Sequence, residues 1–270
     1  MIPEKVKDAI KKARQKGPVA CLTGAGISAE SGIPTFRGKG GLWEKYDPQT
    51  YAYPDGLENL LRREPKKLAD FVSDFYTVLL EAKPNPAHIS LAALEKKGIL
   101  ESVITQNIDD LHALAGSQRI IELHGNAFRI KCAFCSKARE LERKEIQASL
   151  PLLKMDSLSR LEILKILSRF FPRCSCGSRF RIDIVLFGEP LPEEALTGAL
   201  RSLERCSLFL LIGSSLEVYP AASLPSYAKE KGAVLIEINS SLSALSHIFD
   251  YSIKGQASDV MPVLLKILEG

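Results

Sequence analysis

The stretch PVACLTGAGISAESGIPTFRG, from Pro18 to Gly38, gives the first indication of the fold class. A short apolar run leads into Gly24, Gly26 and Ala29, the G-x-G-x-x-A spacing typical of the strand-to-helix turn in dinucleotide-binding folds. The glycines permit a tight turn and close approach of a pyrophosphate, and the small third residue lets the helix pack on the strand. An ordinary strand-to-helix turn can share this pattern, so the rest of the chain must decide.

Further short β-rich runs alternate with amphipathic helical stretches along the chain. Together with residues 18–24 they cover 101–109, 119–125, 182–189, 207–215 and 233–241. Short apolar strands separated by helices predict a doubly wound α/β fold with a parallel, Rossmann-like sheet. Ligands of such folds bind beyond the carboxyl ends of the strands, where several of these runs end in polar residues.

Two segments interrupt this alternation, and the sequence predicts a discontinuous sheet domain with smaller insertions. We expect the dinucleotide-binding sheet domain at 1–37, 91–125 and 182–270, a helical insertion at 38–90, and a module with four cysteines and a helix at 126–181. Within the last segment, Ser157–Phe171 has the pattern of an amphipathic helix. This helix either braces the cysteine-bearing module or offers a surface to a partner.

Composition narrows the class of protein. The chain has 270 residues, 46% hydrophobic and 25% charged, with a net charge of +4. No stretch approaches the roughly 18 consecutive apolar residues of a membrane span. The charged N-terminal segment lacks the apolar core of a secretory signal, so we expect a cytoplasmic protein without a membrane. Lysines and arginines are dispersed, which does not favour direct nucleic-acid binding. The oligomeric state does not follow from the sequence.

Four of the six cysteines form two close pairs. Cys132 and Cys135 make C-x-x-C, and Cys174 and Cys176 make C-x-C. Four thiolates can close a tetrahedral zinc shell, and Gly177 suits the tight knuckle of such a site. Reduced structural cysteines or a redox pair are the alternative. We expect structural Zn²⁺ here.

Polar residues at the predicted strand ends are candidates for chemistry. His124 stands between a strand-like run and Gly125, and residues 105–110 (TQNIDD) are dense in hydrogen-bonding side chains. A capped helix start would also explain that density. Asn239 ends a predicted strand and is a candidate for a ribose hydroxyl. His88, His112 and His247 have weaker individual cases.

The order of these motifs resembles that of the sirtuin family of NAD-dependent protein deacylases. The segments TGAGISAESGIPTFRG, GLW, PNPAH, TQNIDDLH, ELHG, the two cysteine pairs, IVLFGEPLP, GSSLEVYPA and EIN follow one another as they do in that family. The resemblance covers nearly the whole chain from about Val19. It implies NAD as co-substrate and an acylated lysine of a protein or peptide as substrate.

The resemblance also implies roles for individual residues. For NAD it points to Gly24, Ala25, Gly26, Ala29, Thr35, Phe36, Arg37, Trp43, Gln106, Asn107, Ile108, Asp109, Gly213, Ser214, Ser215, Asn239, Ser240 and Ala257. Asp109 resembles the partner of the nicotinamide carboxamide, and Asn107 and Asp109 join His124 in the catalytic set. Substrate contacts are expected at Tyr76, Val185, Phe187, Gly188, Glu189 and Val218.

The implied chemistry is acyl transfer driven by NAD cleavage. The acyl-lysine carbonyl oxygen attacks C1′ of the nicotinamide ribose and expels nicotinamide. His124 resembles the general base that activates a ribose hydroxyl, and free lysine and O-acyl-ADP-ribose result. A neutral imidazole suits this role because its ordinary pKa is about 6.5.

The acyl preference and two alternatives remain as hypotheses. Family members that take succinyl or malonyl groups carry Tyr and, three residues on, Arg, whereas this chain has Tyr76 and Leu79. An acidic acyl group would stay unpaired there, so we expect acetyl or longer apolar groups. A protein mono-ADP-ribosyltransferase is the alternative enzyme. A non-catalytic NAD- or nucleic-acid-binding module is the alternative outside enzymes.

Overall fold

The computed structural model describes residues 2–35 and 41–270. Contacts divide the chain into two compact units. Unit 1 comprises Met1–Thr35, Lys83–His124 and Leu191–Gly270, and unit 2 comprises Phe36–Ala82 and Gly125–Pro190. The insertions expected from the sequence correspond to unit 2 over 38–82 and 126–181, whereas residues 83–90 fall in unit 1 and residues 182–190 fall in unit 2.

Unit 1 contains, within its described residues, a six-stranded parallel sheet. The strands are β1 Val19–Thr23, β2 Leu100–Thr105, β3 Ile120–Glu122, β7 Leu208–Ile212, β8 Val234–Asn239 and β9 Tyr251–Lys254, in the order β3-β2-β1-β7-β8-β9. Numbered within this sheet, the order is the 3-2-1-4-5-6 of doubly wound folds. The predicted α/β class is confirmed. Sequence reasoning missed β9, whose four residues include the polar Ser252 and Lys254.

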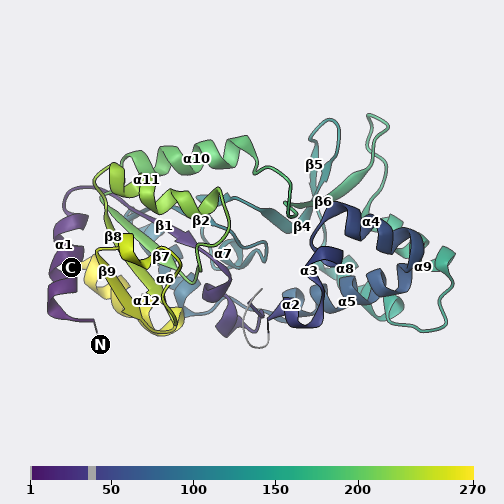
Figure 1. Ribbon diagram of the computed structural model, residues 1–270, viewed down its shortest axis with the longest axis horizontal. Coiled ribbons are helices and arrows are strands. Elements are labelled where there is room, and N and C mark those ends of the chain that lie inside the picture. Colours follow the sequence, from purple (N-terminus) through teal and green to yellow (C-terminus); the bar gives the residue numbers. More distant parts are fainter. Residues whose placement is uncertain (1, 36–40) are drawn as a thin grey trace. The chain divides into compact units, whose positions relative to one another are not determined.

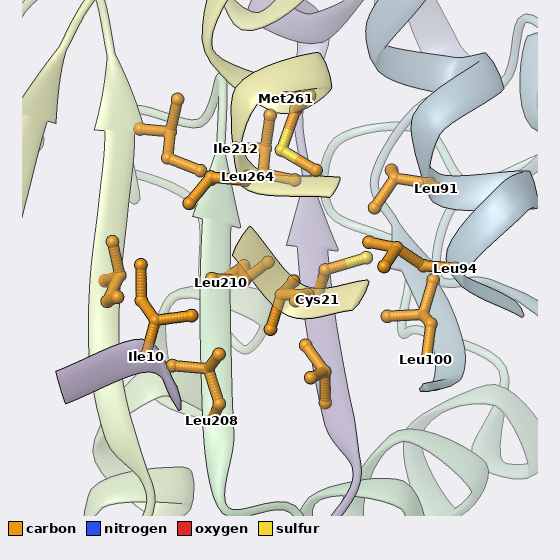
Figure 2. Packing of buried hydrophobic residues seen from close by; sticks show 14 of the residues in the cluster. Ile10, Cys21, Leu91, Leu94, Leu100, Leu208, Leu210, Ile212, Met261 and Leu264 are labelled. Carbon is orange, nitrogen blue, oxygen red and sulfur yellow. The ribbon is translucent and has the colours of Figure 1, made fainter. Parts of the chain in front are cut away.

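Helices cover both faces of this sheet. The helices α1 Glu4–Arg14, α6 Pro86–Lys96 and α12 Ala257–Glu269 pack on one face, and α10 Glu193–Glu204 and α11 Leu224–Glu230 pack on the other (Figure 1). Alternate strand residues serve the two faces, since Cys21 and Leu210 join the first cluster and Leu22 and Leu211 join the second. Figure 2 shows the first cluster. Burial on both faces explains why the central strands β1 and β7 are almost entirely apolar.

Short helical segments complete unit 1. They are α7 Leu111–Leu114 and the 3-10 turns Ala25–Ile27, Ala29–Ser31, Ala221–Ser223 and Ser246–Ile248. Helix α6 belongs to this unit because Ala87, Leu91 and Leu94 pack into the first cluster. None of the helices in the described parts of the chain combines the length and hydropathy that a membrane span requires.

Unit 2 combines helices with a small antiparallel sheet. Its elements are α2 Leu42–Lys45, α3 Pro48–Tyr51, α4 Pro54–Arg63, α5 Pro65–Glu81, β4 Gly125–Cys132, β5 Ala138–Glu140, α8 Arg143–Leu153, α9 Arg160–Phe170 and β6 Phe180–Ile184. The sheet order is β5-β4-β6. Helix α9 confirms the amphipathic helix expected within 157–171, and Ser159 and Glu162 form a capping box at its start.

The prediction that 182–189 forms a strand of the parallel sheet is wrong. The strand β6 ends at Ile184 and pairs antiparallel with β4 in unit 2. Its residues are half-buried or exposed, as in a sheet that faces solvent on one side. The apolar letters of IDIVLF resembled a buried parallel strand, but pairing with β4 depends on contacts that a single run does not encode.

Candidate active site of unit 1

The candidate site residues of unit 1 lie at or just after the carboxyl ends of its strands. Gly24 follows β1, Gln106 follows β2, His124 lies two residues after β3, Gly213 follows β7, and Asn239 ends β8. The strands β1 and β7 are neighbours in the sheet but not in sequence. This is the topological switch point at which doubly wound folds bind ligands.

Three glycines let the loops after β1 and β7 touch. The Gly26 N–H donates to the Gly213 carbonyl oxygen at 2.8 Å. A Cβ on Gly26 would lie 2.7 Å from Gly213 Cα, and one on Gly24 would lie 2.8 Å from the Gly213 oxygen. Gly213 itself has φ +64, where a Cβ would lie 2.3 Å from the Ile27 nitrogen. The glycines therefore serve loop-to-loop packing as well as any approach of a ligand.

We predict that Gly213→Ala destabilises the protein by about 2–5 kcal/mol, since left-handed strain costs about 1–2 and overpacking about 1–3. Gly232→Ala is the matched control, because Gly232 has φ +87 with no atom within 4 Å of its added Cβ. In the control, the free energy of unfolding should fall only by the left-handed strain that the Cβ introduces, about 1–2 kcal/mol. Urea unfolding measures both variants, and equal losses would contradict close packing at Gly213.

Gln106 and Asn107 tie the loop after β2 to the two glycine loops. Gln106 Nε2 donates to Ser214 Oγ at 2.8 Å. Asn107 Nδ2 donates to the Gly24 carbonyl oxygen at 3.2 Å and to Ser28 Oγ at 3.1 Å. Asn107 Oδ1 is buried and has no hydrogen-bond partner among the described residues. A buried acceptor in this state calls for a donor from a ligand or water.

Asp109 ends a chain of hydrogen bonds inside the unit. Ser28 Oγ donates to Asp109 Oδ2 at 2.7 Å, and the Leu111 N–H donates to Asp109 Oδ1 at 2.9 Å. Burial raises the pKa of the Asp109 carboxyl, and the hydrogen bonds from Leu111 and Ser28 only partly offset it. Asp110 has φ 68, a left-handed conformation that Asp tolerates, at the turn into α7.

His88 and His112 lie beneath this network as neutral side chains. The Asn85 N–H donates to His88 Nδ1, so His88 carries its proton on Nε2, which is 3.4 Å from Ser28 Oγ. Burial lowers the pKa of His88 to about 4, and burial also lowers that of His112 well below its ordinary value. His112 Nε2 bonds Thr23 Oγ1 at 2.9 Å. Both rings therefore support the strand ends as hydrogen-bonding groups.

A backbone hydrogen bond fixes the tautomer of His124. Its Nδ1 lies 3.0 Å from the Gln106 carbonyl oxygen, which only accepts, so Nδ1 carries the proton and Nε2 keeps its lone pair. Burial lowers the pKa of His124, and the bond to Gln106 partly opposes this. The imidazole is consequently neutral at pH 7 with a free acceptor nitrogen.

We predict a one-sided pH profile from His124. Its pKa is lowered from the ordinary value near 6.5, so activity should be flat from about pH 7 to 8 and fall below the lowered pKa as Nε2 takes up a proton. The measurement is kcat/KM for NAD-dependent turnover from pH 5 to 9. An acid limb with its midpoint above pH 7 would contradict a base with a lowered pKa.

Unit 1 also contains most of the remaining cofactor candidates and the substrate candidate Val218. Asn239 Nδ2 donates to the Ser214 carbonyl oxygen at 3.0 Å. Glu30 accepts from the Ser258 N–H at 3.0 Å, which joins the segment after the glycine turn to the start of α12 at Ala257. Ala25, Ala29, Thr35, Ile108, Ser215, Ser240 and Val218 lie in unit 1. Phe36 and Arg37 are outside the described residues.

The four paired cysteines meet in unit 2. Their sulfur atoms all lie within 4.8 Å of one another, with Cys132 to Cys176 at 3.5 Å and Cys135 to Cys174 at 3.6 Å. Tetrahedral zinc with Zn–S near 2.3 Å needs sulfurs about 3.8 Å apart, so the set fits Zn²⁺. The Cys135 and Phe134 N–H groups hold the pKa of Cys132 at about 6, which favours the thiolate.

Five of the predicted substrate residues lie in unit 2. Tyr76 is buried in α5 and donates its hydroxyl hydrogen to the Ala127 carbonyl oxygen at 2.7 Å. Phe187 lies 6.4 Å from the Trp43 ring. Glu189 accepts from Arg181 Nη2 at 2.6 Å and from the Leu186 N–H at 2.9 Å, so it orders its own loop. Val185 is half-buried, and Gly188 has φ +85.

Sequence reasoning did not assign Ser28 or Thr23 to the site, and it gave Thr105 and His88 only as general candidates for chemistry, without a role. Ser28 bonds Asn107, Asp109 and His88. It lies two residues past Gly26, in the glycine turn that follows β1. The signal for His88 was its spacing after Asn85, which completes a capping box at the start of α6. All of the predicted roles at the site remain predictions for the functional tests below.

Comparisons with known proteins give the family. The Sir2 family model matches residues 24–220. The NAD-dependent protein deacylase of Pyrococcus furiosus is 47% identical over 246 residues, 91% of this chain and 90% of that protein. The corresponding protein of Thermococcus kodakarensis is 44% identical over 255 residues, 94% of this chain and 91% of that one. A solved Sir2 homolog–NAD complex matches with TM-score 0.80 at 38% identity, over 100% of this chain and 94% of that chain. The chain therefore belongs to the Sir2, or sirtuin, family.

Proposed function

We propose that this protein is an NAD-dependent protein lysine deacylase that yields nicotinamide and O-acyl-ADP-ribose. The observation that carries the proposal is the state of His124, whose Nδ1–H is fixed on the Gln106 carbonyl and whose Nε2 is left as an acceptor. Relatives 47% and 45% identical to this chain are named NAD-dependent protein deacylases.

The residues of unit 1 fit a bound dinucleotide. The loops of Gly24, Gly26 and Gly213 approach each other without side chains, and Asn107 Oδ1 is a buried acceptor without a partner among the described residues. NAD, when bound, supplies an electrophilic ribose carbon and an ADP-ribose group to receive the acyl chain. His124 Nε2 would take the proton of a ribose hydroxyl, and Asn107 Oδ1 would accept a hydrogen bond.

The substrate is an acylated lysine of a protein or peptide. A solved Sir2 protein bound to a deacetylated p53 peptide and 3′-O-acetyl-ADP-ribose matches this chain with TM-score 0.76 at 34% identity, over 98% of each chain. The free cysteines of the zinc set suit a reducing compartment, so we place the activity in the cytoplasm.

The test is an NAD-dependent assay over lysine peptides bearing acetyl, succinyl and long-chain acyl groups, with mass detection of O-acyl-ADP-ribose. Nicotinamide release should require the acylated peptide. No acyl-dependent release from any peptide would reject the proposal, and transfer of ADP-ribose to protein would favour the ADP-ribosyltransferase instead.

The same assay tests the acyl preference. Leu79 is buried in α5 and offers no charge to an acidic acyl group. Leaving such a carboxylate unpaired costs several kcal/mol, so we expect succinyl turnover about 100-fold or more below acetyl turnover. Similar rates for the two peptides would contradict this expectation.

A further inference from the structure

Glu237 is a charged residue in an apolar strand. It is 1% exposed and lies on β8, on the face that Leu235 contributes to the core under α10 and α11. No ion pair reaches Glu237 within the described part of the chain. Buried carboxylates are rare unless they are paired or hydrogen-bonded, so its position requires an explanation.

Neutral donors occupy both oxygens of the Glu237 carboxylate. Oε1 accepts from Asn239 Nδ2 at 3.0 Å and from the Ser243 N–H at 2.7 Å. Oε2 accepts from Ser246 Oγ at 2.6 Å and from Ser252 Oγ at 3.1 Å. Burial alone would raise the pKa of Glu237, but the hydrogen bonds from Ser243, Ser246 and Asn239 outweigh it and lower the pKa. Glu237 is therefore an anion at neutral pH.

This carboxylate fixes the orientation of the Asn239 amide. One Nδ2 hydrogen points to Glu237, and the other goes to the Ser214 carbonyl oxygen at 3.0 Å. Both of these partners are acceptors, so the flipped amide would place oxygen against oxygen twice. Oδ1 is consequently the hydrogen-bonding atom that Asn239, a half-exposed residue, has left to offer a ligand.

Asn239 offers this oxygen at the nucleotide edge of the sheet. It ends β8 and is bonded to Ser214, in the loop that packs on Gly24 and Gly26. An acceptor at a strand end in a doubly wound fold suits a ribose hydroxyl, which donates. A phosphate on that ribose would instead bring oxygens without hydrogens, and negative charge, toward Oδ1 and the Glu237 carboxylate behind it.

We propose that Glu237 is a positioning residue that makes Asn239 an obligate acceptor, so that the site takes a dinucleotide with free adenosine-ribose hydroxyls and rejects its 2′-phosphate. The inference rests on the proposed use of NAD and adds the selection between the two nicotinamide dinucleotides. Glu237 acts through Asn239 and has no assigned contact with the reacting atoms.

Lys254 is the one charge that could oppose this selection from the neighbouring strand. It is the register partner of Asn239 in the β8–β9 pair. Lys254 is exposed, so water and salt screen its attraction for a phosphate, whereas Glu237 is removed from water. Lys254→Met should therefore change the preference less than threefold.

The test measures binding of ADP-ribose and 2′-phospho-ADP-ribose to the full chain by calorimetry, with folding of each variant checked by its urea transition. We expect the parent protein to bind 2′-phospho-ADP-ribose about 100-fold more weakly than ADP-ribose. A buried like charge and an unpaired acceptor should each weaken binding roughly tenfold. Glu237→Gln keeps an acceptor for Asn239 and removes the charge. The Kd of this variant for ADP-ribose should stay within about threefold of the parent value. Its preference for ADP-ribose over 2′-phospho-ADP-ribose should fall about tenfold.

A double-mutant cycle separates positioning from a general structural role. Glu237→Ala and Asn239→Ala should each weaken the binding of ADP-ribose about tenfold. The double variant should bind ADP-ribose no more weakly than either single variant does. Ser252→Ala, which removes one bond to Oε2, is the milder variant if Glu237→Ala does not fold, and it should reduce the preference less than Glu237→Gln does.

Three results would overturn the inference: equal binding of the two ligands by the parent, an unchanged preference in folded Glu237→Gln, or fully additive losses in the cycle. Binding needs no catalysis, so its outcome is independent of the proposed activity. Selective binding without acyl-dependent turnover would reject only the deacylase, and turnover with unselective binding would reject only the role of Glu237.

Discussion

His124→Ala is expected to lower deacylation turnover by about 10³-fold, within the range of a lost general base. The reason is the tautomer: Gln106 holds the Nδ1–H, so Nε2 is the acceptor that the variant removes. Because the base acts after nicotinamide leaves, the variant should still exchange labelled nicotinamide into NAD in the presence of acyl peptide. Product formation and label exchange, measured on the same samples, separate the two steps.

Two further variants sharpen this prediction. His124→Asn can still donate to the Gln106 carbonyl but cannot accept a proton as imidazole does, so it should be as inactive as His124→Ala. His247 lies in the exposed 3-10 turn Ser246–Ile248, and His247→Ala is the matched control with turnover within about twofold. If His124→Asn retained most of the activity, His124 would act by positioning and not as a base.

Cys174→Ser is expected to remove the zinc ion and unfold the cysteine-bearing part of unit 2. The four sulfurs lie within 4.8 Å of one another, and Cys174 is buried among them. Three thiolates and a hydroxyl bind Zn²⁺ far more weakly, and structural zinc in small domains contributes about 10 kcal/mol or more to folding. The zinc content should fall from one ion per chain to below about 0.2, and the thermal transition should broaden or split.

The control for the zinc prediction is a cysteine outside the cluster. Cys206 is buried in the second core cluster of unit 1, where burial raises the pKa of its thiol to about 11. Cys206→Ser should keep one zinc per chain. A strong chelator applied to the parent protein should reproduce the Cys174→Ser transition, and full zinc content in Cys174→Ser would contradict the four-thiolate site.

Several elements of the fold could be predicted from local pattern. The strand β7 is continuously apolar, β1 is apolar up to Thr23, and β8 is apolar apart from Glu237 and Asn239. All three were expected from this pattern, because each is buried by helices on both faces. The strand β9 was missed because edge strands are short and half-polar. The run 182–189 was misassigned because the same letters suit a half-buried antiparallel strand, and its partner β4 lies more than 50 residues away.

The candidate site divides in the same way. The strand-end residues Gly24, Asn107, His124 and Asn239 were found because their positions in sequence mark strand ends. The sequence did not show which side-chain atoms of these residues are already hydrogen-bonded and which remain available to a ligand. That Asn107 and Asn239 each offer only Oδ1 follows from acceptors in other loops and, for Asn239, also from Glu237 on its own strand.

The sequence by itself determined the α/β class, the family, the cysteine set and the strand ends that carry polar residues, because these depend on local periodicity, spacing and motif order. The tertiary structure alone decided that β6 belongs to the antiparallel sheet, that the glycines pack loop against loop, which nitrogen of His124 carries the proton, and which groups bond the buried Glu237 carboxylate. Each of those depends on which atoms the folded chain brings within contact distance, because hydrogen bonds and van der Waals contacts act only over a few ångströms. The partners of Glu237 are close in sequence, but only the loop after β8 and the strand β9 bring them to its carboxylate.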